Sequence, residues 1–102
     1  MEFLLSVEVR LPPTMEEAQR ARLIEEERIR GCELAEEGVI RAIWRVPGRF
    51  ANRAIWSAVD ATELHDAIQS LPLWPYIDVT VTPLARHGLG EYCPGLPPGL
   101  GV

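Results

Sequence analysis

Apolar and polar residues alternate along residues 3 to 11, and the apolar ones share one face: Phe3, Leu5, Val7, Val9 and Leu11. A period of two is typical of a half-buried β-strand. The same alternation recurs near the other end of the chain, from Ile77 to Thr82. The two patterns predict a first and a last strand, each with one polar face.

Two helices are predicted between these strands. Thr14 and Glu17 have the spacing of a capping box, and Gly38 is a typical stop, so we expect a long helix between them. Asp60 and Glu63 form a second capping box, which opens a helix that runs to about residue 70.

The remaining apolar segments predict a central hairpin, with strands at residues 39–46 and about 53–59 joined through Pro47-Gly48. The resulting order, β-α-β-β-α-β, predicts an α+β ferredoxin-like sandwich: a four-stranded antiparallel sheet with two helices on one face. Residues 1–87 are expected to form this domain. Residues 88–102 are expected to form a Gly/Pro-rich C-terminal tail, either disordered or laid over a neighbouring subunit.

Composition narrows the functional classes. The chain has 102 residues and a net charge of −5, which argues against a general nucleic-acid binder. No apolar run approaches the roughly 20 residues that cross a bilayer, and the N-terminus does not read as a secretory signal. Cys32 and Cys93 fit no metal or redox spacing, so we expect free thiols in a reducing cytoplasm. A domain this small buries a modest fraction of its surface, so oligomerisation is a reasonable expectation.

The predicted first helix carries a carboxylate on its apolar face. Steps of three and four residues place Glu27 with Ile24, Gly31 and Leu34. Burial raises the pKa of a carboxyl towards the range of a general base, and Gly31, a poor helix former, leaves room for a ligand. The alternative is that Glu27 lies at the edge of the stripe and pairs with Arg28 or a strand arginine.

Two arginines on the second strand also allow two interpretations. Arg41 and Arg45 lie on either side of Ile43, and an arginine pair on one strand face can bind a carboxylate. Salt bridges to Glu8, Asp78 or another subunit are equally consistent with the pattern.

A double-proline turn, Leu71-Pro72-Leu73-Trp74-Pro75-Tyr76, connects the second helix to the last strand. Its prolines fix φ and remove two backbone donors, so it is either a stiff connector or the wall of a small pocket. Nearby, His65 has the position of a helix-surface or packing residue, whereas His87, at a strand end beside a loop, is a better acid-base candidate. We expect the three tryptophans to have packing or interface roles rather than to form a ligand cage.

The chain resembles the muconolactone Δ-isomerase family over residues 1 to 88. The segments that carry the resemblance are Arg10-Leu11-Pro12, Glu27-Arg28 with Gly38, Trp44-Arg45 with Gly48, Ala51-Asn52, Leu64-His65-Asp66, the double-proline turn and Arg86-His87. The spacing of the double-proline turn from Trp44-Arg45 and from Arg86-His87 makes this resemblance specific.

The resemblance implies a ferredoxin-like fold and large cytoplasmic homo-oligomers, typically decamers, with active sites between subunits. It also implies a cofactor-independent enzyme of aromatic catabolism, in the β-ketoadipate pathway, that moves the ring double bond of muconolactone. A related enzyme instead eliminates chloride from a chlorinated muconolactone. The expected partners are a small-molecule lactone and further copies of the chain, with no metal, nucleic acid or membrane.

The resemblance also assigns roles to residues. Glu27 is expected to shuttle the proton, Arg28 or Arg45 to anchor the substrate carboxylate, and His87 to donate a hydrogen bond. The expected pocket lining is Phe50, Trp74 and Tyr76.

The central hairpin departs from the family pattern, because typical members carry His-Tyr where this chain has Arg49-Phe50. The change removes hydrogen-bonding groups and adds a cation. Three hypotheses follow: a lactone isomerase, a dehalogenating lyase, and a non-catalytic oligomeric binding protein on the same scaffold.

Overall fold

The structure, a computed structural model, describes residues 1–96, and its first element is the strand that the alternation predicts. β1 spans Glu2–Val9. Phe3, Leu5 and Val7 are buried, and the residues between them are partly exposed. The apolar face of β1 therefore points into the protein, as predicted.

α1 spans Glu17–Glu36 and ends before Gly38, whose φ of +81° lies in the left-handed region that favours glycine. The predicted capping box at Thr14 is wrong. The residue before α1 is Glu16, whose side chain makes no capping hydrogen bond. Thr14 lies in a turn in which the Met15 N–H donates to the Pro12 carbonyl at 3.1 Å, so this turn occupies the position where the helix was expected to start.

β2 (Ile40–Arg45) and β3 (Ala51–Ser57) form the predicted central hairpin. Their pairing is irregular between Ile40 and Ala42, so regular alternation does not run through Arg41. The prediction that Arg41 and Arg45 share one face requires regular alternation between them. The irregular pairing interrupts that alternation, so the prediction loses its basis.

α2 spans Ala61–Gln69, and its predicted cap is confirmed because the Glu63 N–H donates to the Asp60 carboxylate at 2.9 Å. The double-proline turn contains a short 3₁₀ helix, η1 (Trp74–Tyr76), and leads into β4 (Ile77–Leu84). A one-turn helix, α3 (Leu89–Tyr92), lies in the expected tail, where no element was predicted. The rest of that tail, residues 97–102, lies outside the described residues.

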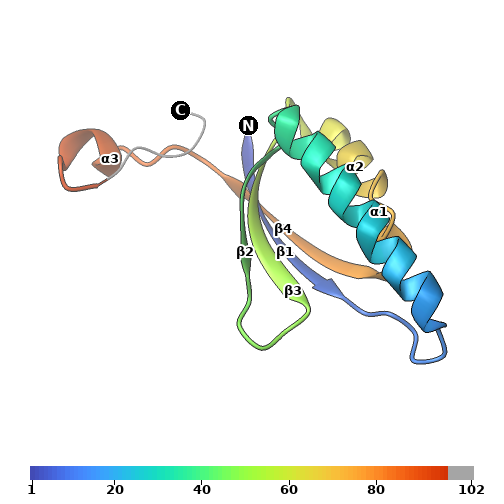
Figure 1. The fold of residues 1–102 in the computed structure, drawn as a ribbon. Coiled ribbons are helices and arrows are strands. Elements are labelled where there is room, and N and C mark those ends of the chain that lie inside the picture. The colour runs from blue at the N-terminus through green and yellow to red at the C-terminus, as the bar shows by residue number, and fades with distance from the viewer. Residues whose placement is uncertain (97–102) are drawn as a thin grey trace.

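The four strands form one antiparallel sheet in the order β2-β3-β1-β4. α1 and α2 lie together on one face of this sheet (Figure 1), which confirms the ferredoxin-like sandwich. Figure 1 also shows that α3 lies apart from α1 and α2, on the segment that leaves β4.

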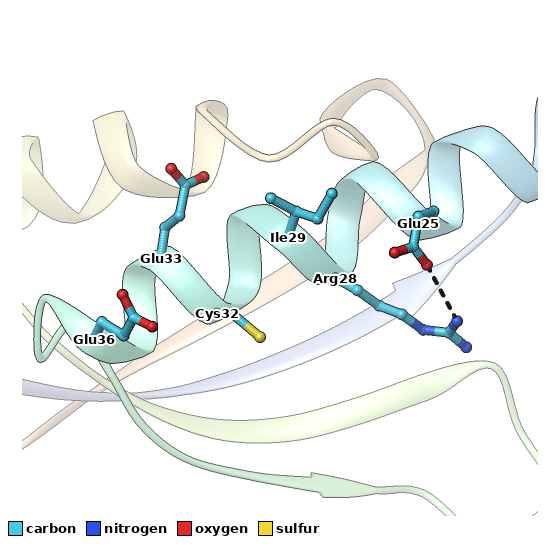
Figure 2. Close-up of a pocket in the computed structure, with 6 residues that line it drawn as sticks. All are labelled: Glu25, Arg28, Ile29, Cys32, Glu33 and Glu36. Carbon is cyan, nitrogen blue, oxygen red and sulfur yellow. Dashed lines mark ion pairs between the residues drawn. The ribbon is translucent and has the colours of Figure 1, made fainter.

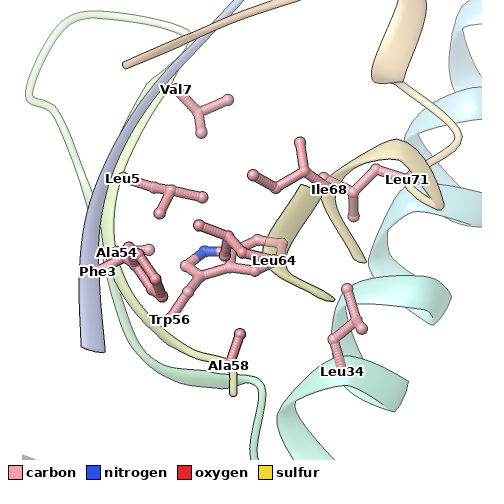
Figure 3. Close-up of a cluster of buried hydrophobic side chains, with 10 residues drawn as sticks. All are labelled: Phe3, Leu5, Val7, Leu34, Ala54, Trp56, Ala58, Leu64, Ile68 and Leu71. Atoms are coloured by element: carbon pink, nitrogen blue, oxygen red, sulfur yellow. The ribbon is translucent and has the colours of Figure 1, made fainter. Parts of the chain in front are cut away.

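The hydrophobic core lies between the sheet and the two helices (Figure 3), and its members are Phe3, Leu5, Val7, Leu34, Ala54, Trp56, Ala58, Leu64, Ile68 and Leu71. α2 contributes Leu64 and Ile68, whereas the one buried residue of α1 is Leu34, in its last turn. The earlier turns of α1 therefore lie beside the core, and this is where Glu27 is found.

The other face of the sheet is uncovered and chemically mixed. The register pairs Ser6 with Thr80 and Glu8 with Asp78, which confirms the predicted polar face of β1 and β4. Trp44 pairs with Arg53 on this face, and 56% of its surface is exposed. The sheet thus presents an aromatic side chain among polar groups to the outside.

Candidate active site

Glu27 lies on the sheet-facing side of α1 and is half-buried. Its Oε1 atom accepts a hydrogen bond from the backbone N–H of Leu73 at 3.0 Å. Burial raises the pKa of the Glu27 carboxyl above its usual value of 4.5, and the Leu73 hydrogen bond opposes this rise. No arginine lies within ion-pair distance of Glu27 in residues 1–96, so the alternative in which it pairs with an arginine is not realised there.

The double-proline turn supplies the donor for Glu27. The N–H of Trp74 donates to the Leu71 carbonyl at 2.9 Å, and the N–H of Tyr76 donates to the Leu73 carbonyl at 2.8 Å. Leu71 and Leu73 are both buried. These backbone bonds and buried side chains fix the turn, which leaves the Leu73 N–H free to point at the carboxylate of α1.

A second side chain of α1 holds the same connection. The Arg30 Nε–H donates to the Ser70 hydroxyl at 3.0 Å, and that hydroxyl donates to the Ala67 carbonyl at 2.6 Å. Glu27 and Arg30 are three residues apart, so they lie on neighbouring turns of one helix face. α1 therefore contacts the connection between α2 and β4 at two successive points.

Open space lies beside Glu27, one turn further along the helix. A methyl group built on Gly31 would meet no atom within 4 Å in the described residues. Gly31 therefore adjoins open space within one chain, and the use of that space by a ligand stays a prediction.

The aromatic residues of the turn are only partly buried. Trp74 packs against the edge of the core, with its ring edge-on to that of His65 at 5.6 Å. His65 thus packs against an aromatic ring, as the sequence favoured. Tyr76 is half-buried, and its carbonyl accepts a hydrogen bond from the Arg10 N–H at 2.7 Å. Trp56, in contrast, is a core residue with 3% of its surface exposed.

The two arginines proposed as carboxylate anchors lie in different places. Arg28 projects from the outward side of α1, where its guanidinium lies 3.7 Å from the Glu25 carboxylate and its side chain is 74% exposed. Arg45 pairs with Asn52, which in turn pairs with Val7 of the core face, so Arg45 lies on the helix-facing side of the sheet. Within one chain, Arg45 and Glu27 both lie on the side where the sheet faces the helices, whereas Arg28 lies on the outward side of α1.

Phe50 connects Arg45 to α1. The guanidinium carbon of Arg45 lies 5.7 Å from the centre of the Phe50 ring, and that of Arg20 lies 5.8 Å from the same centre. Both distances are within the range of cation–π contacts. The acids expected as alternative partners of Arg45 contact other arginines instead: Glu8 contacts Arg10 and Arg49, and Asp78 contacts Arg10.

His87 does not join Glu27 in one chain. It follows the last residue of β4, whereas Leu73, which contacts Glu27, precedes the first. An eight-residue strand is roughly 25 Å long, so about that distance separates the two groups. The Nδ1 atom of His87 accepts a hydrogen bond from the Leu89 N–H at 3.0 Å. A neutral ring therefore carries its proton on Nε2, which can donate elsewhere.

A shallow open hollow on the outward side of α1 (Figure 2) is lined by Glu25, Arg28, Ile29, Cys32, Glu33 and Glu36. These residues lie on the face of α1 opposite to Glu27. The proton transfer expected from Glu27 is therefore not located in this hollow.

Two groups at the site were missed from the sequence. The Leu73 N–H could not be found, because a backbone donor leaves no mark in a sequence and its partner is 46 residues away. Arg20 could have been found, because it lies seven residues before Glu27 and therefore on the same side of α1.

Two further findings concern metals and membranes. Residues 1–96 contain no group of three or more metal-ligating side chains placed to hold an ion. None of the helices in that range is long and apolar enough to span a bilayer.

Comparisons with known proteins identify the family of the chain. The family described as muconolactone delta-isomerase matches residues 1–89. The chain is 40% identical to muconolactone Delta-isomerase 2 of Acinetobacter lwoffii and 37% identical to the muconolactone Delta-isomerase of Pseudomonas aeruginosa, each over 85% of this chain and 91% of the relative. A crystal structure of muconolactone isomerase superposes with a TM-score of 0.81 at 36% identity, over 85% of this chain and 91% of the other. The chain therefore belongs to the muconolactone Δ-isomerase family.

Proposed function

We propose that this chain is a cofactor-independent isomerase that moves the ring double bond of muconolactone or a similar unsaturated lactone, as a step of aromatic catabolism in the β-ketoadipate pathway. The observation that carries the proposal is the Glu27 carboxylate, half-buried on the sheet-facing side of α1 and held by the Leu73 N–H. The names of the relatives, all of which are muconolactone Delta-isomerases, support the choice of substrate.

The reaction is a proton transfer without change of oxidation state. The Glu27 carboxylate takes a proton from a ring carbon made acidic by the unsaturated lactone, and the electron pair of that C–H bond moves into a dienolate. The protonated carboxyl then returns the proton to another ring carbon, so the double bond shifts. A raised pKa suits both steps, because the carboxylate is a stronger base and its conjugate acid still donates.

Arg45 anchors the free carboxylate of the substrate in this proposal. Its guanidinium has no acidic partner within 4.0 Å in residues 1–96, and it lies in the same layer as Glu27. Phe50, next to Arg45, provides an apolar wall, and Trp74 and Tyr76 limit the site on the side of the double-proline turn.

The site is completed by a second copy of the chain. The helix-facing side of β2 is uncovered in one chain, where Ile43 is 56% exposed. α3 and the segment that leads to it lie apart from α1 and α2 (Figure 1), so they can reach a neighbouring subunit. In that arrangement His87 of one copy donates its Nε2–H to the lactone at the Glu27 of another. The assembly proposed is the decamer typical of the family, working in the cytoplasm, where Cys32 and Cys93 stay unpaired.

Incubation with muconolactone and with its chlorinated analogue tests the proposal. Ultraviolet absorbance follows the double-bond shift, and a halide assay follows release of chloride. Isomerisation of muconolactone supports the proposal. Release of chloride without isomerisation would replace it with a dehalogenating lyase, and no reaction with either lactone would leave a binding protein on the same scaffold.

A further inference from the structure

Arg20 is a cation at the site to which neither the sequence nor the proposed mechanism gives a role. It projects from the end of the first turn of α1, whereas Arg45 comes from the end of β2, and both guanidinium groups lie within 5.8 Å of the centre of the same Phe50 ring. Their guanidinium carbons are therefore no more than twice that distance apart. Phe50 brings two charges from separate elements into one small region.

Neither charge has an acidic partner within 4.0 Å in residues 1–96. The chain has no lysine, and five of its ten arginines lie within 4.0 Å of an acidic group in the described part of the chain: Arg10, Arg28, Arg30, Arg49 and Arg86. Arg20 and Arg45 belong to the other five, together with Arg22, Arg41 and Arg53, but only these two share a contact with Phe50 in residues 1–96. Two like charges near one another are unfavourable in the empty protein, and an anion between them relieves that repulsion.

The two contacts to Phe50 are compatible with one carboxylate held by both groups. Opposite charges in contact lie about 4 Å apart, so two guanidinium groups that share a carboxylate are separated by about 8 Å, within the limit set by Phe50. Arg20 also lies seven residues before Glu27, which is roughly 10 Å along the same side of α1. A small lactone held between them would direct its ring to Glu27 and its carboxylate to the arginines.

We propose that Arg20 is a second ligand of the substrate carboxylate, and that Arg20, Arg45 and Phe50 together select lactones that carry a free acid over neutral lactones. The inference rests on the proposed function for the identity of the lactone. The inference adds Arg20 as a binding residue and explains the preference for acidic lactones: the site binds its substrate through two positive charges, one of which is supplied by α1.

The test is calorimetric titration at low salt with two unreactive probes. The first is the saturated γ-lactone that carries an acetic acid side chain, and the second is the methyl ester of this acid. Arg20→Gln is compared with Arg22→Gln, which makes the same charge change two residues away on the opposite side of α1. Both arginines are exposed, so both variants should fold like the wild type, which circular dichroism checks.

We expect Arg20→Gln to weaken binding of the acid about tenfold, the effect of losing one hydrogen bond to a charged group. We expect Arg22→Gln to bind the acid as tightly as the wild type, and all three proteins to bind the ester equally weakly. The inference is overturned if Arg20→Gln binds the acid as tightly as Arg22→Gln, or if the wild type does not prefer the acid to the ester. If the wild type does not isomerise muconolactone, the proposed function is refuted but the inference about Arg20 is not. The two outcomes are distinct because the titration measures binding and requires no turnover.

Discussion

At the scale of single residues, Glu27 is subject to two opposing influences. Burial disfavours its charged form, whereas the Leu73 N–H favours it, and burial is the larger effect. The result is a carboxylate of raised pKa that is nevertheless fixed in position by one directional bond. Those are the two properties that a proton shuttle requires, because it must accept a proton and return it within one binding event.

Glu27→Gln should reduce kcat by about a hundredfold to ten-thousandfold, the usual contribution of a general base. The amide oxygen of glutamine can still accept the Leu73 hydrogen bond, so the local structure should survive. The absorbance assay with muconolactone measures the change. Glu26→Gln, an exposed neighbour on the same helix, is the matched control and should keep wild-type activity. Full activity in Glu27→Gln would remove Glu27 from the mechanism.

The same substitution should make stability depend less on pH. Folding raises the pKa of Glu27, so the folded chain binds more protons than the unfolded chain between the two pKa values. The stabilising contribution is therefore complete below the unfolded pKa and is lost as the pH rises through the folded pKa. We expect Glu27→Gln to melt above the wild type at neutral pH, with the difference shrinking as the pH falls towards 4.5. Thermal unfolding at several pH values tests this, and a difference that is constant with pH contradicts it.

Gly31→Ala should separate stability from activity. Alanine is the better helix former by about 1 kcal/mol, and its methyl group would meet no atom within 4 Å in the empty protein. We therefore expect a higher melting temperature together with a raised KM, because the methyl group occupies space beside Glu27. Cys32→Ala, on the outward side of the same turn, is the control and should leave KM unchanged. Unchanged kinetics in Gly31→Ala would show that the substrate does not use that space.

At the scale of elements, the double-proline turn connects packing to chemistry. Its leucines are buried in or beside the core, and its backbone bonds hold Leu73 in place. Because α1 contacts this connection through both Glu27 and Arg30, a shift of either element would change the environment of the carboxylate. The turn is thus a fixed connector that also supplies the hydrogen-bond donor of Glu27.

Replacement of the Leu73 amide by an ester deletes one N–H and leaves every side chain intact. The carboxylate of Glu27 then loses the group that lowers its pKa, so the pKa should rise further. Glu27 acts as a base in its charged form, and the acidic limb of kcat/KM should therefore move to higher pH. The control is an ester at Trp74, which removes a comparable bond to Leu71 in the same turn. An identical pH profile for both esters would show that the Leu73 bond does not tune Glu27.

At the scale of the whole molecule, one chain leaves several surfaces uncovered. The outer face of the sheet exposes Trp44, the helix-facing side of β2 exposes Ile43, and α3 lies apart from the helical layer. His87 is separated from Glu27 by the length of β4. These features agree with a site shared between copies, in which each chain gives Glu27 to one site and His87 to another.

Mixing inactive subunits tests this arrangement. Glu27→Gln and His87→Ala chains are unfolded together and refolded into mixed oligomers. If each site takes Glu27 and His87 from different chains, random assembly restores both residues in about a quarter of the sites, and activity should rise above that of either variant alone. The two variants refolded separately and then combined are the control. A mixture that is no more active than this control would place both residues in one chain or remove His87 from the site.

The sequence by itself determined the order of elements and the face of α1 that carries Glu27. Both depend on local periodicity, which follows from the geometry of strands and helices. The capping box at Thr14 and the alternation through Arg41 failed because a local turn and an irregular strand pairing overrode the pattern.

Only the tertiary structure decided which distant groups meet. The bond from Leu73 to Glu27 and the placing of Arg20 and Arg45 beside Phe50 join elements that are far apart in the chain. Within one chain, the structure also placed Arg28 on the outward side of α1 and His87 beyond the far end of β4. Spacing along a chain fixes the face on which a residue lies, but contact across elements depends on how the packed layers bring those faces together.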